Sequence, residues 1–387
     1  MTTDKAEAIS AWLDEQAPAM LVLLGELVDI DSGSHDKAGV DRVGARLVRF
    51  YAEHSIDVTT IPIAGFGDIL RAEAGPASRG RGRRNYLLMG HRDTVFGKGE
   101  AVRRPFSTRD GRAYGPGVAD MKGGLVMNAF VMAALKRFAP EIPVVSLMTG
   151  DEEIGSATAR PSIEAEAKCA VAVFNSEPGR VSGNIVTGRK GGFGYRFDIT
   201  GKAAHSGVNF TEGASAIAEL AHKINALHAL TDVEEGMTLN VGLVGGGVSV
   251  NTVAPTASGE VDVRFVTNAQ RDALIEAIDA IMATSFVSGT STKAVRDSDF
   301  FPLVPTPRSE ELTRRYLEIA RTIGLDIEGE FTGGCADSGF AASAGAPTIC
   351  GVGPVGGKAH TEEEYIETAT LAQRARVAAL TIFAMAQ

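Results

Sequence analysis

The sequence is poor in cysteine and has no excess of positive charge. Three cysteines among 387 residues are too few and too scattered for a disulfide framework. Cys169 and Cys350 lie in apolar runs, so we expect both to be buried thiols. The net charge of −10 argues against a nucleic-acid partner, because phosphate binding favours a basic surface, and it argues weakly against anionic membranes.

Targeting and membrane-spanning patterns are also missing. Residues 1–5 do not form a basic stretch followed by an apolar core, so we expect no signal peptide. We find no apolar run of the length needed to cross a bilayer, and therefore expect no membrane contact. The cytoplasm is the expected location.

The composition is that of an ordinary globular protein with more than one core. Hydrophobic residues make up 44% of the chain and charged residues 22%. At 387 residues the chain exceeds the size of one typical core, so two domains are expected. Helical spacing of apolar residues predicts a helix over 6–28, with Trp12 as a core anchor, and the Gly-, Arg- and Ser-rich stretch 75–84 predicts an exposed loop.

Three strand-like apolar runs each lead into acidic or histidine residues. The runs and the residues that follow them are 86–89 with His91, 144–148 with Asp151 to Glu153, and 170–174 with Glu177. A predicted helix over 123–138 separates the first two runs. Alternating strands and helices predict an α/β domain with a doubly wound, mostly parallel sheet. Ligands gather outside the carboxyl ends of the strands in such sheets, so we expect these side chains at one edge.

The pattern of the chain changes near residue 188. Strands are predicted near 195–200, 239–244 and 259–266, and helices over 211–230 and 269–286. These elements predict a compact α+β insert. The main domain resumes near residue 300 and ends in a helix over 368–386. The predicted organisation is therefore a discontinuous domain, 1–187 and 298–387, with an inserted domain, 188–297.

His91 and Asp93 lie at the end of the first predicted strand. Side chains two apart on a strand point to the same side. His91 can then bind a metal ion through one ring nitrogen while Asp93 orients the other.

Asp120 lies in a glycine-rich turn, Gly115 to Gly124, which precedes the helix over 123–138. The turn lacks the spacing of a phosphate-binding loop, and its lysine does not precede Ser or Thr. A carboxylate in such a flexible turn suits a ligand that bridges two metal ions.

Glu152 and Glu153 follow the second predicted strand as adjacent carboxylates. Such neighbours repel each other and need either a cation or exposure to water. A pair of metal ions makes Glu153 a ligand and Glu152 a base that takes a proton from the attacking water and passes it to the leaving nitrogen. Glu177 and His360 complete a set with enough ligands for two ions and one carboxylate to spare.

Taken in this order, the motifs resemble the glutamate carboxypeptidase branch of the aminoacylase and carboxypeptidase family of dinuclear zinc peptidases. The resemblance implies two zinc ions, with cobalt or manganese as substitutes, and a cis peptide bond after Asp120. A glutamate at position 177 fits the glutamate carboxypeptidase and desuccinylase side of the family. The ligands that the resemblance implies are His91, Asp120 as the bridge, Glu153, Glu177 and His360, with Glu152 as the base and Asp93 behind His91.

The resemblance also implies that the insert is a lid and dimerisation domain, so the protein would be a homodimer. His205, in the stretch Gly201 to Gly207, would stabilise the oxyanion in the active site of the partner subunit. The side chains implied in holding the substrate carboxylate are Arg264 and Asn251, with Lys190 as a further candidate. The loop of Gly334 would line the pocket, and Cys335 stands where relatives often carry glycine.

Together these observations predict a zinc-dependent hydrolase of N-acyl amino acids or small peptides with a free carboxylate. The leading hypothesis is a carboxypeptidase that releases C-terminal glutamate, and the alternative is an aminoacylase or N-deacylase, either a deacetylase or a desuccinylase. A non-catalytic carboxylate-binding module with a relict metal site belongs to a different class. The presence of Glu152 beside all the predicted ligands argues against that module.

Overall fold

The computed structural model describes residues 2–76 and 84–387, so most of the loop predicted over 75–84 lies outside the described residues. The chain forms two compact units. Unit 1 contains the residues up to 188 together with 303–332 and 337–387, and unit 2 contains 189–302 and 333–336. Each unit is built around its own sheet.

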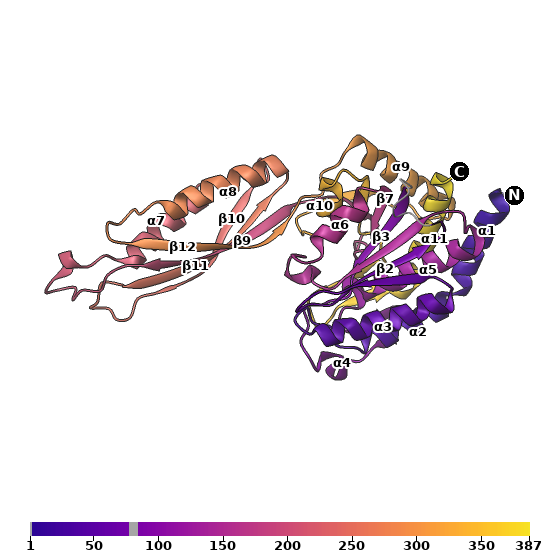
Figure 1. Cartoon of the computed structure of the whole chain (residues 1–387), viewed down its shortest axis with the longest axis horizontal. Coiled ribbons are helices and arrows are strands. Elements are labelled where there is room, and N and C mark those ends of the chain that lie inside the picture. The colour runs from indigo at the N-terminus through magenta and orange to yellow at the C-terminus, as the bar shows by residue number, and fades with distance from the viewer. Residues whose placement is uncertain (1, 77–83) are drawn as a thin grey trace. The chain divides into compact units, whose positions relative to one another are not determined.

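Unit 1 is built on an eight-stranded sheet with the order β1-β2-β6-β3-β7-β14-β8-β13 (Figure 1). The strands are β1 (Asp57–Ile61), β2 (Ile69–Ala74), β3 (Asn85–His91), β6 (Val144–Thr149), β7 (Ala170–Asn175), β8 (Ile185–Arg189), β13 (Gly329–Thr332) and β14 (Thr348–Cys350). The pairs β6–β3, β3–β7 and β7–β14 are parallel, whereas β1–β2, β2–β6 and β14–β8 are antiparallel. The sheet is therefore mixed, with a parallel centre.

Helices and a small antiparallel sheet complete unit 1. The helices are α1 (Thr2–Glu15), α2 (Ala17–Val28), α3 (Lys37–Glu53), α4 (Glu100–Arg103), α5 (Gly123–Phe138), α6 (Arg160–Ala167), α9 (Pro307–Thr322), α10 (Ser338–Ser343) and α11 (Thr368–Met385). The small sheet has the order β15-β16-β5-β4, formed by β15 (Gly356–Gly357), β16 (Tyr365–Glu367), β5 (Arg112–Tyr114) and β4 (Ser107–Arg109).

The sequence explains why β3 and α5 form the centre of unit 1. Every residue of β3 is buried, as expected for a central strand that is covered on both faces. Helix α5 packs against α1, α2 and α11 in the main hydrophobic core. The stretch Val118–Phe138 is apolar and long enough to cross a membrane by composition, which our search of the sequence did not anticipate, but 94% of its most apolar window is buried inside the protein.

Unit 2 is a four-stranded antiparallel sheet, β10-β11-β9-β12, against which two helices pack. The elements are β9 (Gly191–Thr200), β10 (Thr238–Gly246), β11 (Thr256–Phe265), β12 (Ser291–Phe300), α7 (Ala216–His228) and α8 (Asn268–Ala283). Phe193, Tyr195 and Phe197 alternate along β9 and are buried in the core of this unit. The predicted fold class, an α/β domain with an inserted α+β unit, describes this architecture.

Some local predictions were wrong. The helix predicted over 6–28 is two helices, α1 and α2, because the chain breaks near Gln16, and the second helix begins with a proline in its first turn. The helix predicted from 211 begins at Ala216, since Gly213 is extended. Cys169 is exposed rather than buried, because it lies in the turn before β7, while Cys350 is buried in β14 as predicted.

Candidate metal centre

The parallel strands at the middle of unit 1 bring three predicted site residues to one edge of the sheet. His91 is the last residue of β3. Glu152 lies just after β6, in the short 3₁₀ helix Glu152–Ile154, and Glu177 lies just after β7. Because β3 pairs in parallel with both β6 and β7, their carboxyl ends meet at the same edge.

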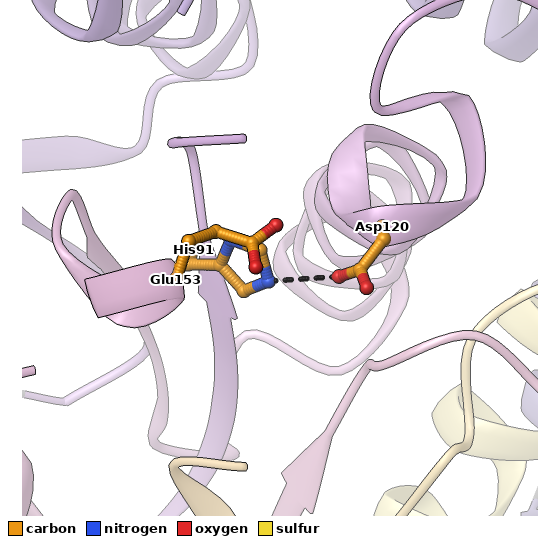
Figure 2. A group of neighbouring side chains, drawn as sticks. All are labelled: His91, Asp120 and Glu153. Carbon is orange, nitrogen blue, oxygen red and sulfur yellow. Dashed lines mark hydrogen bonds and ion pairs between the residues drawn. The ribbon is translucent and has the colours of Figure 1, made fainter. Parts of the chain in front are cut away.

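Asp120 reaches this edge from the irregular turn Val118–Lys122 that precedes α5. The peptide bond between Asp120 and Met121 is cis, as the family resemblance implies. Asp120 Oδ1 lies 3.0 Å from His91 Nε2, and Asp120 Oδ2 lies 3.4 Å from His360 Nε2 (Figure 2 shows the first contact). The carboxylate therefore faces one imidazole with each oxygen.

Two clusters of potential metal ligands share His91. One contains His91, Asp120 and Glu153, and the other contains His91, Glu152 and Glu177, with the ligand atoms of each cluster within 4.8 Å of one another. His360 Nε2 lies 3.2 Å from Glu153 Oε2, so His360 borders the first cluster. The five predicted ligands and Glu152 therefore converge on one site.

The donor set fits metal ions. Glu153 Oε1 is buried and has no hydrogen-bond partner among the described residues, which is costly unless a cation satisfies it. Carboxylate oxygens and imidazole nitrogens are the ligands that zinc prefers in catalytic sites. The residues present could therefore hold metal ions in the two clusters that share His91.

Burial and mutual repulsion perturb the acids of this site. Burial raises the pKa of Glu152 well above its usual value, and the nearby carboxylates of Glu177 and Asp337 raise it further, whereas His91 opposes the shift. Burial also acts to raise the pKa of Asp120, but its hydrogen bonds to His360 and His91 hold that pKa below the usual range. Such a concentration of buried carboxylates is typical of a site that binds cations or moves protons.

Asp93 connects His91 to the turn that carries Glu152 and Glu153. The Nδ1 atom of His91 lies 3.0 Å from the backbone oxygen of Asp93 and 3.4 Å from its carboxylate, so the backbone carbonyl is the nearer acceptor. The carboxylate itself accepts the backbone N–H groups of Glu152 and Glu153 at 3.2 and 3.1 Å, and the Ser34 hydroxyl at 2.8 Å. Asp93 thus fixes both the histidine ring and the acidic turn.

Glu364 is a site residue that our sequence analysis did not single out. Its buried carboxylate accepts the backbone N–H groups of Gly117, Ala119 and Asp120 at 3.0, 2.8 and 2.9 Å. Burial raises the pKa of Glu364 to about 7, although these hydrogen bonds oppose the shift. Glu364 holds the turn that presents Asp120, and its position four residues after His360 was the available signal.

We expect Glu364→Gln to weaken metal binding about 10- to 100-fold, the usual cost of losing a group that supports a ligand. The amide can accept through only one atom, so the Asp120 turn loses part of its hydrogen bonding. Competition with a chelating dye measures the affinity. Glu363→Gln is the matched control, because Glu363 is exposed and pairs with Lys358. Equal affinities of the two variants would contradict the role of Glu364.

Asp337 is a second buried acid near this edge of the sheet. Its carboxylate accepts the hydroxyl groups of Ser156 and, at 3.4 Å, Thr149. Burial raises its pKa to about 7, and Asp151 and Asp93 add to this effect. Because Thr149 ends β6 and Ser156 follows the acidic turn, Asp337 fastens both ends of the segment that carries Glu152 and Glu153.

Unit 2 places the remaining predicted residues in two separate groups. His205 is exposed and forms a β-bridge with Thr252, and Ser206 donates its N–H to the backbone oxygen of Asn251, so His205 and Asn251 lie together. Both flank the start of β11, which begins at Thr256. Arg264 is near the opposite end of that strand, about 25 Å away at the usual rise per residue.

Arg264 has the loop of Gly334 beside it. Its Nη1 atom lies 2.8 Å from the sulfur of Cys335, and its other nitrogens pair with Asp262. Arg189 donates to the backbone oxygen of Gly334 at 3.0 Å. Lys190 donates instead to the backbone oxygen of Gly236 at 2.6 Å. Within one chain, the loop of Gly334 therefore lies near Arg264, whereas Asn251 lies far from Arg264.

Comparison with known proteins identifies relatives over nearly the whole chain. A family model described as peptidase family M20/M25/M40 matches residues 87–384. Carboxypeptidase G2 of Pseudomonas sp. (strain RS-16) is 29% identical over 376 residues, 95% of this chain and 89% of that protein. Acetylornithine deacetylase of Edwardsiella ictaluri is 24% identical over 384 residues, 92% of this chain and 95% of that protein.

A solved structure has the same fold. The M20 family metallo-carboxypeptidase Sso-CP2 from Sulfolobus solfataricus matches with a TM-score of 0.77 and 20% identity, covering 94% of this chain and 98% of that one. The region matched by the family model contains every predicted metal ligand, from His91 to His360.

Proposed function

The chain belongs to peptidase family M20/M25/M40 and is a hydrolase, and we propose that it uses two zinc ions to cleave the amide bond of N-acyl amino acids or small peptides with a free carboxylate. The observation that carries the proposal is the placement of Asp120 between His91 and His360, one carboxylate oxygen toward each. A carboxylate that presents one oxygen toward each of two histidines is suited to bridging a pair of metal ions. Cobalt or manganese are possible substitutes for zinc.

The geometry of the site supports a role for each of the nearby protein groups. Two bound ions would polarise the amide carbonyl and make water more acidic. Glu152 takes the proton of the attacking water and delivers it to the leaving nitrogen, a role that suits a buried carboxylate whose pKa burial raises well above its usual value. Asp93 keeps His91 in the orientation that turns Nε2 toward Asp120.

We propose that Arg264 binds the free carboxylate of the substrate. The residue most expected to carry that carboxylate is a C-terminal glutamate. A planar guanidinium binds a carboxylate through two parallel hydrogen bonds. Arg264 is held in place by Asp262 and by Cys335, and burial opposes its charge while these two neighbours raise its pKa. Asn251, Lys190 and Gly334 remain further candidates for substrate contacts.

We expect Arg264→Gln to raise KM about 10- to 100-fold with a smaller effect on kcat, because a hydrogen bond to a charged group contributes about 1.5–3 kcal/mol. Steady-state kinetics on an N-acyl amino acid measures the effect. Arg196→Gln is the matched control, since Arg196 also lies in unit 2 and pairs with an aspartate, Asp297. An unchanged KM in the Arg264 variant would contradict the assignment.

The substrate class is tested by turnover of the metal-loaded protein on a panel of N-acyl amino acids. The C-terminal residue is varied first and the acyl group second. A strong preference for glutamate, lost on chelation, supports the carboxypeptidase, whereas broad hydrolysis of acetylated residues supports an aminoacylase or N-deacylase. Relatives carry both kinds of name, carboxypeptidase G2 and acetylornithine deacetylase. No hydrolysis of any amide would refute the proposal and favour a binding module.

We also propose that the protein is a cytoplasmic homodimer in which His205 completes the active site of the partner. The separation of His205 from Arg264 along β11 supports this arrangement, because the two side chains are too far apart to contact one small substrate within one chain. Closure of unit 2 as a lid would then assemble the site.

Mixing two inactive variants tests the shared site. Subunits carrying Glu152→Gln and subunits carrying His205→Ala are expected to regain about a quarter of the wild-type activity after exchange, because half of the dimers are mixed and each mixed dimer has one intact site. Each variant alone, carried through the same exchange protocol, is the control. No recovery in a mixture shown to contain mixed dimers would contradict the sharing of His205.

A further inference from the structure

A cavity of about 460 Å³ adjoins the metal centre within unit 1. Its two walls are the segments 33–36 and 94–98, and Glu153 and Ile154 line it from the acidic turn. The volume lies within the range of small-molecule sites. Because the ligand Glu153 contributes to its wall, a substrate whose carbonyl is held at the metal centre has one of its two halves beside this cavity.

The walls of the cavity are fixed to each other by backbone contacts. Gly33 forms a parallel bridge with Thr94, and Thr94 donates its N–H to Ser32 at 2.9 Å. A side chain at Gly33 would place its Cβ 2.5 Å from the backbone oxygen of Phe96, so only glycine allows this approach. Asp31 accepts the N–H of Gly99 at 2.7 Å and anchors the end of the second wall. The cavity is therefore built into the fold.

The lining contains four ionisable side chains, those of His35, Asp36, Lys98 and Glu153. Asp36 and Lys98 pair with each other at 3.2 Å, and the carboxylate of Glu153 belongs to the metal centre. The His35 ring lies against Phe66, with 6.0 Å between the ring centroids. The apolar side chains of the lining include Val95, which is 46% exposed, and Ile154. An apolar chain placed here would be removed from water, whereas a charged acyl group would have to compete with the existing pair of Asp36 and Lys98.

We propose that this cavity, which we name the Val95 pocket, is the subsite for the acyl group and takes an uncharged, apolar acyl chain larger than acetyl. The inference rests on the proposed function. If Arg264 binds the carboxylate of the leaving amino acid, the acyl half is the part of the substrate that remains for the pocket beside Glu153. Specificity for the acyl group is then set in unit 1 by the segments 33–36 and 94–98.

Two substrate series with the wild-type, metal-loaded protein test the subsite. Along N-acetyl, N-butanoyl and N-hexanoyl glutamate, kcat/KM is expected to rise by up to about fourfold for each methylene buried. N-Succinyl glutamate is expected to be a poorer substrate than N-butanoyl glutamate, which has the same number of acyl carbons but no acyl charge. A flat acyl series, or a preference for succinyl, would overturn the proposal.

Filling the pocket tests its location. Val95→Trp is expected to lower the hexanoyl-to-acetyl ratio of kcat/KM at least tenfold, while the ratio between different amino acids on one acyl group stays the same. Gly97→Leu is a second variant with the same expected effect, because a Cβ at Gly97 meets no atom within 4 Å. Val22→Trp is the matched control, since Val22 is 64% exposed on α2 and does not line the pocket.

The outcomes separate the subsite from the reaction itself. A change confined to the acyl series supports the Val95 pocket. A change confined to the amino-acid series, or an unchanged ratio in both filling variants, would overturn it while leaving the amidohydrolase intact. The wild-type protein could also fail to hydrolyse every substrate of both series, including acetyl glutamate. That result would overturn the proposed function and the subsite with it.

Discussion

Replacing Glu152 by Gln is expected to lower kcat about 10²- to 10⁴-fold while both metal ions remain bound. The amide keeps the shape of the side chain but cannot accept the proton of the attacking water. Glu152 is buried beside His91, with its Oε2 atom 3.9 Å from His91 Nε2, so its carboxylate is close enough to serve the same reaction centre. Elemental analysis together with steady-state kinetics measures both quantities on one preparation.

The two clusters of potential ligands make this test informative. A carboxylate oxygen of Glu152 lies within 4.8 Å of the potential ligand atoms of His91 and Glu177, which is close enough for Glu152 to be a metal ligand itself. If Glu152→Gln loses an ion along with its turnover, Glu152 is a ligand and its assignment as the base is wrong. Glu276→Gln is the control, because Glu276 is exposed on α8 and far in sequence from every candidate ligand.

Asp120→Ala is expected to lower the metal content below one ion per chain and to reduce turnover by about a thousandfold or more. The reason is that Asp120 faces both His91 and His360, so in the proposed two-metal site its removal would take an oxygen ligand from each ion. Loss of several kcal/mol of stabilisation from the ions corresponds to that factor in rate. Metal content after gel filtration and kcat on the same sample provide the measurement.

Asp326→Ala provides the comparison for Asp120→Ala, since Asp326 is an exposed aspartate of unit 1. It should retain two ions and full turnover. An Asp120 variant that retained both ions would mean that the carboxylate does not bridge them, and the two-metal arrangement would need a different ligand.

The strand-end residues of the site could be predicted because their strands are simple to recognise. Buried apolar runs such as β3 predict central strands, and the parallel pairing of β3 with its neighbours puts His91, Glu152 and Glu177 at one edge. The order of the motifs was sufficient to indicate the family, and the match to the M20/M25/M40 model confirms that resemblance.

The supporting contacts could not be predicted in the same way. Glu364 is 244 residues from Asp120 in the chain, and its role depends on the irregular turn that aims three backbone N–H groups at it. The pairing of His91 with the backbone oxygen of Asp93 also depends on local geometry, because sequence spacing favours neither the carbonyl nor the carboxylate.

The separation of His205 from Arg264 could not be predicted either, because it depends on how the strands of unit 2 pair. Both residues belong to motifs of the insert, and the sequence suggested a single role for Arg264 and Asn251 in holding the carboxylate. The antiparallel register of β11 with β9 places Arg264 opposite Gly192 and Thr256 opposite Thr200, so the two motifs lie at opposite ends of the strand. Sequence spacing alone does not fix that register.

Titration of metal-free protein with zinc tests the central claim most directly. The protein is chelated, shown to be free of metal and then followed for amide hydrolysis as zinc is added. The two-metal account predicts negligible turnover without metal and a maximum at two equivalents per chain. Turnover that survives chelation, or that reaches its maximum at one equivalent, would contradict it.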